Sequence, residues 1–468
     1  PHSSAGGTPY TGGSPPRHPA VTSSNLREPP AVGWRIAEPA PLRDRLFRRW
    51  LRNEMVERMR GQRLLKLPED YRQELFDEIH KVVVERFGPG VAAGLQPTQQ
   101  IVAGLIAANR LADVEEFAQW ESGIRPAGAL EPLGWEDGSL STGFTAEYGP
   151  PGEPVTFRAD GDKNLLAPPL PQTSLDAIAL LGADTSAPLA KSKVDLVVRE
   201  RSTAAEFFQP VELTREKVAV EGREGYFRQI LRATSEVDPL TAANGGGLDA
   251  GIWDVLIRIS SCGWTKETRL GSVRGEEAGS GRRAAVLGSP ARLVLPYWTD
   301  PHGNLSLDVG QKTNRISYEF AGLAPADVTV STDPGRLSLV LPFHVPGESA
   351  ATVRLKNASA SRSVDLTATL DARGSDRAEL SAALPLDELT DGQWRLELTV
   401  PATGGGKPVA LPLVLDVSAS GGVVVKQLAA AAADLAATAP ARRKPAGRPA
   451  EPTLLRRAAG KLRRAMKK

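Results

Sequence analysis

The sequence predicts an α+β multidomain protein, in which a small helical module is followed by two antiparallel immunoglobulin-like β-sandwiches and a C-terminal amphipathic helix. Three observations predict this order. Apolar residues recur about one helical turn apart over residues 41–125. Short runs that alternate apolar and polar residues fill residues 140–418. The last residues place leucines and many basic side chains at helical spacing.

Residues 1–40 are rich in Gly, Pro and Ser. We expect them to be disordered, because such a segment buries too little apolar area to offset the entropy lost on ordering. They lack the apolar core of a signal peptide. The chain starts at Pro1 instead of methionine, which predicts a truncated product.

The helical module is expected over residues 41–125. Its second helix carries an apolar stripe from Tyr71 to Phe87 and should stop at Gly88-Pro89-Gly90. We expect a third helix after Pro97 and a fourth from Asp113. His80 stands among the charged residues of the second helix, so its side chain is predicted to be solvated.

The first sandwich is assigned to residues 140–312 and the second to residues 313–418. Both contain a tryptophan, Trp253 or Trp394, that follows a glycine by two residues and begins an alternating strand. In such a strand the tryptophan and every second residue after it share one face. We interpret this shared signature as two related domains. A chance match between two strand starts is the alternative.

Residues 419–452 are predicted to be an Ala- and Pro-rich tether, and residues 453–468 a basic amphipathic helix. A helix this short cannot span a bilayer, but it can lie on an anionic membrane surface. The residues expected to bind the membrane are Leu454, Leu455, Arg456, Arg457, Lys461, Leu462, Arg463, Arg464, Met466, Lys467 and Lys468.

The charge of the chain is unevenly distributed. The formal net charge of the whole chain is +2. From Arg442 onward, 11 basic residues and the single acid Glu451 give a charge of +10, so the rest of the chain carries −8. An acidic body argues against a general nucleic-acid binder. Cys262 is the only cysteine, so no intrachain disulfide can form, which fits a reducing cytosol. No apolar run reaches the ~20 residues of a membrane-spanning helix.

The residues predict no catalytic or metal site, and no cofactor is expected in this chain. Asp160-Gly-Asp162 matches the Asp-x-Asp motif that binds a divalent metal and a nucleotide diphosphate, but it lies in a turn-rich β region, which favours a solvated turn. Cys262 is predicted to be a packed structural thiol and His344 a structural residue at a strand end. A binding or architectural role is therefore expected.

One loop has the composition of a glycan-binding site. Two aromatic residues there could stack on a sugar or polyol while nearby polar groups form hydrogen bonds. The candidate glycan-binding residues are Tyr297, Trp298, Asp300, His302 and Asn304. The alternative, which we favour, is that Asp300-Pro-His-Gly303 forms a turn between the two sandwich domains.

Several motifs carry a family resemblance. Leu42-Arg-Asp-Arg-Leu-Phe-Arg-Arg-Trp50 and Glu85-Arg-Phe87 resemble the helical region that follows the catalytic domain in bacterial family-2 glycosyltransferases. Gly251-Ile-Trp-Asp254, Trp264-Thr-Lys-Glu-Thr-Arg-Leu-Gly271 and Pro301-His-Gly-Asn-Leu-Ser306 resemble the C-terminal β domains of the same proteins. The nearest type is the wall teichoic acid glycosyltransferases.

The resemblance implies an enzyme that transfers a sugar from a nucleotide-sugar to a teichoic-acid-like polymer at the cytoplasmic face of the plasma membrane. The divalent metal and the nucleotide-sugar are expected only for its catalytic domain, which would precede residue 41. The partners it implies are a polyol-phosphate or glycan polymer, an anionic membrane surface and further copies of the chain, bound through the β domains. Nucleic acid is not expected.

Two hypotheses follow. In the first, the chain is the non-catalytic C-terminal part of such a glycosyltransferase and serves oligomerisation, acceptor binding and membrane docking. In the second, it is a stand-alone, non-enzymatic scaffold or binding protein with two immunoglobulin-like domains. The coding sequence upstream of Pro1 would discriminate between them, because only the first hypothesis expects a nucleotide-sugar domain there.

Overall fold

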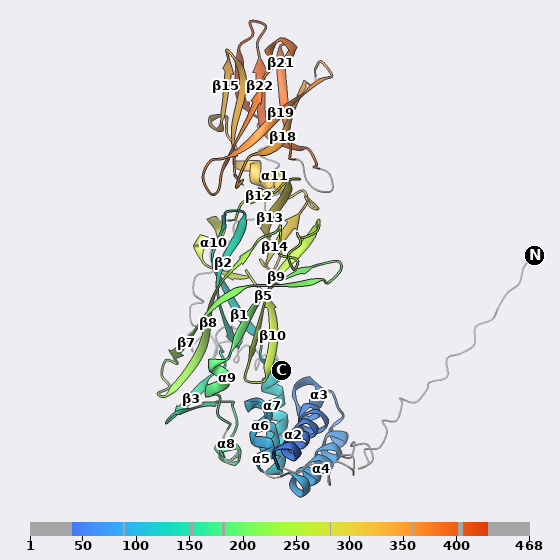
Figure 1. Cartoon of the computed structure of the whole chain (residues 1–468), viewed down its shortest axis with the longest axis vertical. Coiled ribbons are helices and arrows are strands. Elements are labelled where there is room, and N and C mark those ends of the chain that lie inside the picture. Colours follow the sequence, from blue (N-terminus) through green and yellow to red (C-terminus); the bar gives the residue numbers. More distant parts are fainter. Residues whose placement is uncertain are drawn as a thin grey trace, which may run out of the picture. The chain divides into compact units, whose positions relative to one another are not determined.

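The computed structural model describes residues 40–428, except residues 88, 150–152, 180–182, 281, 358 and 401–405. The described chain forms two compact units (Figure 1). The helical unit contains the chain up to Ile124 together with Phe157–Pro188, and the β unit contains Arg125–Thr156 and the chain from Leu189. The predicted terminal helix, residues 453–468, and residues 1–39 of the predicted disordered segment lie outside the described residues.

The expected helical module is confirmed. Its α-helices are α2 (Ala40–Trp50), α3 (Gly61–Leu65), α4 (Glu69–Arg86), α5 (Pro89–Ala93), α6 (Pro97–Ala107) and α7 (Leu111–Gly123). A π-helical turn, η2 (Leu51–Met55), and a 3₁₀ turn, η3 (Val56–Met59), join α2 to α3.

Helix α6 forms the centre of this module. Its residues from Pro97 to Ile106 are buried, and the side chain of Gln99 caps the helix start by accepting a hydrogen bond from the Gln96 amide at 3.3 Å. The prediction for His80 was wrong. Its ring is half-buried, with Nδ1 2.7 Å from the Ile106 carbonyl oxygen, because α4 packs against α6.

The helical unit also contains a segment that the sequence placed in the first sandwich. This segment forms the hairpin β3 (Phe157–Asp160) and β4 (Lys163–Leu166), followed by α8 (Gln172–Ala179). Helix α8 packs against α6. Helix α9 (Ser186–Ala190) then leads into the β unit.

The β unit begins with two sheets. In the first, strands follow the order β11-β1-β2-β8, and β7 pairs with β8. In the second, the order is β17-β12-β13-β14-β9-β5-β6, and β10 also pairs with β9. The first sheet contains β1 (Pro126–Glu136), β2 (Ser139–Tyr148), β7 (Val211–Ala219), β8 (Tyr226–Val237) and β11 (Val273–Arg274). The second contains β5 (Lys193–Glu200), β6 (Glu206–Gln209), β9 (Gly251–Ser261), β10 (Trp264–Arg269), β12 (Ala284–Leu287), β13 (Arg292–Trp298), β14 (Leu305–Val309) and β17 (Phe343–His344). A short helix, α10 (Glu276–Ser280), precedes β12.

The third sheet is antiparallel and curls until its edge strands β15 and β23 contact each other, so it is nearly a barrel (orange in Figure 1). Its order is β15-β16-β20-β19-β18-β21-β22-β23. The strands are β15 (Val328–Thr332), β16 (Gly335–Leu341), β18 (Ser349–Asn357), β19 (Arg362–Ala372), β20 (Ala378–Ala383), β21 (Gly392–Thr399), β22 (Val409–Val417) and β23 (Val423–Gln427). Strand β23 lies within the range assigned to the tether. The short helices are α11 (Ile316–Glu319), η4 (Phe320–Gly322), η5 (Pro325–Asp327) and η6 (Leu386–Glu388).

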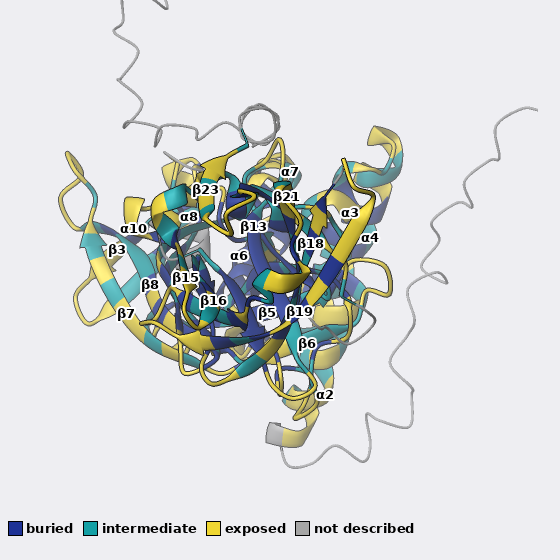
Figure 2. Ribbon diagram, turned by 90° about the horizontal axis from the view of Figure 1, so that it is seen from above, coloured by how far each residue is buried: buried dark blue, intermediate teal, exposed yellow. Residues whose placement is uncertain are grey.

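Residues in these strands alternate between buried and exposed, as expected from their period of two. The alternation is clearest in β19 and can be followed in Figure 2, where buried residues are dark blue and exposed residues yellow. The α+β class, a helical module followed by β-sheets, is thus confirmed. The finer assignment to two immunoglobulin-like sandwiches stays a prediction. No helix of the described residues combines the length and apolarity needed to cross a membrane.

The two signature tryptophans occupy matching positions. Trp253 begins the core face of β9 and Trp394 that of β21, and both side chains are buried. Each indole Nε1–H donates a hydrogen bond to the carbonyl four residues earlier, at 3.0 Å to Asp249 and 2.8 Å to Thr390. The same local motif therefore starts one strand in the second sheet and one in the third.

Candidate functional site

The predicted glycan-binding loop is the hairpin between β13 and β14. The Thr299 N–H donates to the Asn304 carbonyl at 2.8 Å, and the Gly303 N–H donates to the Thr299 carbonyl at 2.6 Å. The turn interpretation is confirmed, but the turn joins neighbouring strands of one sheet and not two domains. Asp300 and His302 are exposed at its tip.

The two aromatic residues of the predicted loop line one pocket together. Tyr297 is buried and Trp298 half-buried, and both face a pocket of about 440 Å³ within the β unit. Asp300, His302 and Asn304 are not among its lining residues. We call this cavity the arginine–aromatic pocket, after the seven residues Arg282, Arg283, Arg315, Arg377, Tyr297, Trp298 and Tyr318 in its wall.

The pocket gathers residues from distant parts of the chain. Tyr297 and Trp298 end strand β13, Arg282 and Arg283 precede β12, and Arg377 precedes β20. Arg315 precedes α11, which itself provides Tyr318 and Glu319. The second and third sheets therefore build the pocket together.

Two of the arginines have carboxylate partners. Arg282 Nη1 lies 2.9 Å from Glu319 Oε1 and donates to the Pro296 carbonyl at 2.8 Å. Arg283 Nε lies 3.9 Å from Asp376 Oδ2, which is a weak pair. These contacts hold Arg282 in the wall of the pocket.

The other two arginines leave the pocket wall with a net charge of +1, because its four arginines face three acids, Glu319, Asp376 and Asp327. Within the described part of the chain, neither Arg315 nor Arg377 has a carboxylate at ion-pair distance. The guanidinium of Arg315 lies 4.5 Å from the centroid of the Tyr297 ring, a cation–π contact that leaves its N–H groups available to a ligand.

A further arginine supports the aromatic wall. Arg274 lies 4.3 Å from the Trp298 ring centroid, and its Nη1 donates to the carbonyls of Gly271 at 2.8 Å and Gly303 at 3.1 Å. Burial, followed by the nearby charge of Arg282, lowers the pKa of Arg274. Neighbouring arginines thus repel each other here, and an anion in the pocket would relieve that repulsion.

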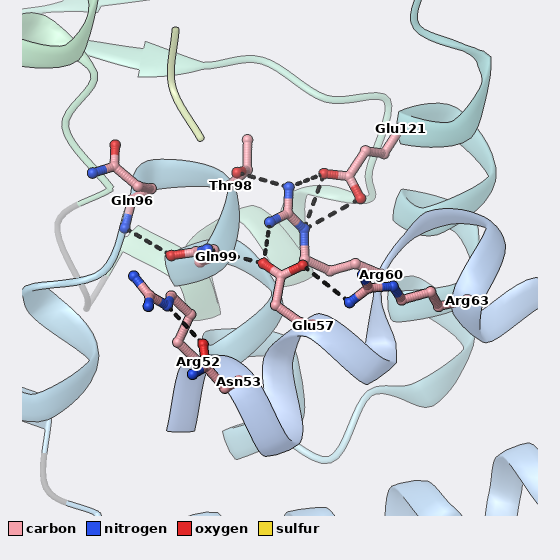
Figure 3. A network of polar contacts seen from close by, with 9 residues as sticks. All are labelled: Arg52, Asn53, Glu57, Arg60, Arg63, Gln96, Thr98, Gln99 and Glu121. Atoms are coloured by element: carbon pink, nitrogen blue, oxygen red, sulfur yellow. Dashed lines mark hydrogen bonds and ion pairs between the residues drawn. The ribbon is translucent and has the colours of Figure 1, made fainter. Parts of the chain in front are cut away.

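The helical unit contains a different polar cluster (Figure 3). Arg60 donates to Glu121 Oε1 from Nε at 3.1 Å, to Glu57 Oε1 at 2.8 Å and to Thr98 Oγ1 at 3.1 Å. Gln99 Nε2 also donates to Glu57 Oε1, at 2.9 Å. Burial alone would lower the pKa of Arg60. Hydrogen bonds and charge attraction from Glu121 and Glu57 have the larger effect, so the pKa of Arg60 is raised. With its charges balanced, this cluster joins η3, α6 and α7 and is structural.

The residues weighed for chemistry lie in inert settings. Asp160 and Asp162 flank the exposed tip of the β3–β4 hairpin, as the solvated-turn interpretation predicted. Cys262 is buried in the β9–β10 turn, and burial raises the pKa of its thiol to about 11. His344 is buried and stacks on Trp135, with Nδ1 2.7 Å from the Ser375 carbonyl oxygen. Among the described residues, no three His, Cys, Asp or Glu side chains are grouped to hold a metal ion.

Two protein-family models match separate parts of the chain. Residues 25–118 match the model described as "Glycosyl transferase TarS linker domain". Residues 178–309 match the model described as "TarS beta-glycosyltransferase C-terminal domain 1". The chain contains a TarS linker domain and TarS C-terminal domain 1. The expected resemblance to wall teichoic acid glycosyltransferases is therefore confirmed. The second match ends at the last residue of β14, so it includes Tyr297 and Trp298 but not Arg315 or Arg377.

Solved structures were also compared. The crystal structure of S. aureus TarS aligns at 11% identity and a TM-score of 0.28, covering 73% of this chain and 54% of that one. The present chain thus spans about half the length of that TarS. The crystal structure of S. aureus TarS 217-571 aligns at 12% identity and a TM-score of 0.28, covering 81% and 96%. GBS pullulanase SAP in complex with maltotetraose aligns at 10% identity and a TM-score of 0.21, covering 60% and 22%. No curated protein matches the sequence significantly.

Sequence reasoning found the aromatic half of the pocket and missed its arginines. Tyr297 and Trp298 were visible because they are adjacent in the chain and lie beside polar groups. Arg315 and Arg377 are isolated in sequence and meet only when the third sheet packs on the second. The pair Arg282-Arg283 was the one local signal available.

Proposed function

We propose that this chain is a non-catalytic part of a TarS-like glycosyltransferase that binds the anionic acceptor polymer in the arginine–aromatic pocket. The observation that carries the proposal is Arg315, which lies over Tyr297 and has no carboxylate partner among the described residues. Acceptor binding is favoured over a purely architectural role because a structural arginine in a packed wall is normally paired, as Arg282 is.

The chemistry of the pocket matches a polyol-phosphate repeat. Guanidinium groups bind phosphate oxygens through two parallel, charge-assisted hydrogen bonds. Aromatic faces such as Tyr297 and Trp298 pack against the C–H groups of a sugar or polyol. A neutral glycan would use the aromatic faces alone and would leave the net positive charge of the pocket wall uncompensated.

Substitution of pocket arginines tests this proposal. We expect Arg315→Gln and Arg377→Gln each to weaken binding of a purified polyol-phosphate polymer about tenfold or more, because a hydrogen bond to a charged group contributes about 1.5–3 kcal/mol. Arg354→Gln is the matched control, since Arg354 is exposed on β18 and pairs with Asp365 outside the pocket. Binding is measured by isothermal titration calorimetry. Equal affinities for all four proteins would contradict the proposal.

We also propose that the chain works at the cytoplasmic face of the plasma membrane, where residues 453–468 dock on anionic lipid. The basic and apolar residues of this segment support the proposal. Within the described residues, α2 offers a second basic surface, where Leu42 and Leu46 are 46% and 51% exposed beside Arg45 and Arg49. We further propose self-association through the β domains, which light scattering would detect as a mass above that of one chain.

Deletion of residues 453–468 tests the membrane proposal. The full chain should co-sediment with phosphatidylglycerol-containing vesicles at low salt, and the deletion variant should lose most of this binding, because each basic residue near such a surface contributes about 1 kcal/mol. Vesicles of phosphatidylcholine alone are the control and should bind neither protein. Undiminished binding of the deletion variant would show that the segment is not the anchor.

A further inference from the structure

A row of cross-strand neighbours leads away from the pocket across the second sheet. Tyr297 on β13 pairs with Ser306 on β14, and Ser306 pairs with Asp254 on β9. Directly paired residues in a sheet point to the same face. The face that presents Tyr297 to the pocket therefore presents Ser306 and Asp254 beside it.

Two arginines converge on this row. Arg201 Nη2 donates to Asp254 Oδ1 at 2.5 Å, and Arg269 Nη2 donates to the same oxygen at 2.6 Å. Arg269 Nη2 also donates to Ser306 Oγ at 2.8 Å, and that hydroxyl donates to Asp254 Oδ1 at 2.9 Å. One carboxylate thus serves two guanidinium groups, and the cluster carries one surplus positive charge.

The two arginines of the cluster differ, because hydrogen bonding to Asp254 raises the pKa of Arg201 while the pKa of Arg269 is lowered. Burial is the main cause that lowers the pKa of Arg269, and the adjacent charge of Arg201 lowers it further, against the attraction of Asp254. Arg269 Nε is buried without a hydrogen-bond partner. The side chain of Arg201 is 46% exposed, so its outward N–H groups are accessible to a ligand.

A neighbouring cluster on the same sheet shows the contrast. Arg199 lies opposite Asp254 in the β5–β9 pairing, yet it binds Glu206 at 2.7 Å and Glu267 at 2.8 Å. Arg258 binds the same two glutamates at 2.9 Å and 2.8 Å. Two arginines and two glutamates make this quartet neutral. Of these two clusters, the one that adjoins Tyr297 is the one with surplus positive charge.

We propose that Arg201 and Arg269 form a second anion subsite, which binds a phosphate or phosphodiester group next to the arginine–aromatic pocket. Asp254 and Ser306 hold the two guanidinium groups in place. The anion would accept hydrogen bonds from the outward N–H groups of Arg201 and Arg269. The link to a polymer rests on the proposed function: a chain with repeated phosphates would occupy the pocket and this subsite together, with Tyr297 between them.

The test is designed around Arg201, whose exposure makes its substitution compatible with folding. Inorganic phosphate and a short glycerol phosphodiester are titrated into the full chain, and binding is followed by nuclear magnetic resonance of the arginine Nε–H groups. We expect Arg201→Gln to weaken phosphate binding about tenfold, the effect of losing one hydrogen bond to a charged group. Arg354→Gln, on the third sheet, should leave it unchanged.

The results separate the subsite from the pocket. Arg315→Gln should keep the phosphate-induced shift of the Arg269 signal while it weakens polymer binding. If Arg269 responds to phosphate but no polymer binds, the subsite stands and the proposed function fails. Phosphatidylglycerol vesicles that shift the Arg269 signal more than the soluble phosphodiester would assign the subsite to a lipid headgroup. No response of Arg269 to phosphate, or equal losses in Arg201→Gln and Arg354→Gln, would overturn the subsite.

Discussion

At the residue scale, surplus charge distinguishes arginines that hold the fold from arginines available to a ligand. Arg60 is buried with a carboxylate or hydroxyl opposite each of its bonded nitrogens. Arg315 and Arg201 retain unused donors, Arg315 over an aromatic ring and Arg201 beside a shared carboxylate. Sequence reasoning cannot make this distinction, because two of the three partners of Arg60 lie 38 and 61 residues away and those of Arg201 lie 53 and 105 residues away.

The buried Arg60 cluster should be costly to break. We expect Glu121→Gln to destabilise the helical unit by about 3 kcal/mol, because the buried Arg60 guanidinium then keeps only Glu57 as a carboxylate partner. Hydrogen exchange of the α6 and α7 amides measures the effect, which corresponds to roughly 100-fold faster exchange. Glu54→Gln is the control: its partner Arg58 is exposed, so the change should cost less than about 0.5 kcal/mol. Matching effects of the two substitutions would contradict the structural role of the cluster.

At the scale of elements, strands with a clear period were predictable and irregular ones were not. The alternating runs around Trp253 and Trp394 became β9 and β21. Strand β1 contains two prolines and two glycines and gave no such signal. It tolerates Pro132 because the register shifts between Leu130 and Leu133, and proline is accepted at such bulges. The docking of α8 on the helical unit was also missed, since it depends on a contact across 61 residues.

The contact between Asp113 and Ser174 predicts that the stability of the helical unit depends on pH. Burial would raise the pKa of Asp113, but hydrogen bonds from Ser174 and Arg110 outweigh it and lower the pKa below its usual value. A depressed carboxyl pKa stabilises the fold above the unfolded-state pKa of about 3.9, and the contribution is lost as the pH falls through the folded-state value. When the pH is lowered from 5 to 2, the urea midpoint for unfolding of the helical unit should therefore decrease. This decrease should be smaller in Asp113→Asn than in the unchanged protein. The half-exposed Asp44 provides the control, Asp44→Asn. An equal fall in all three would refute the assignment.

At the scale of the whole molecule, the sequence was sufficient for the order of helical and β regions but not for the site. The order follows from local periodicity, which short windows reveal. The arginine–aromatic pocket needs β12, β13, α11 and β20 to meet, and no local pattern encodes that meeting. The boundary between the units was likewise hidden, because Phe157–Pro188 leaves the β unit and joins the helices.

Two ligands of the same length distinguish binding of an anionic polymer by the β unit from binding of a neutral chain. One is a polyol-phosphate polymer and the other an uncharged polyol chain, each titrated into the full protein at low and at physiological salt. We expect measurable affinity for the charged polymer alone, and this affinity should weaken as salt screens the exposed arginines. Equal affinity for both ligands, or affinity for neither, would contradict this expectation.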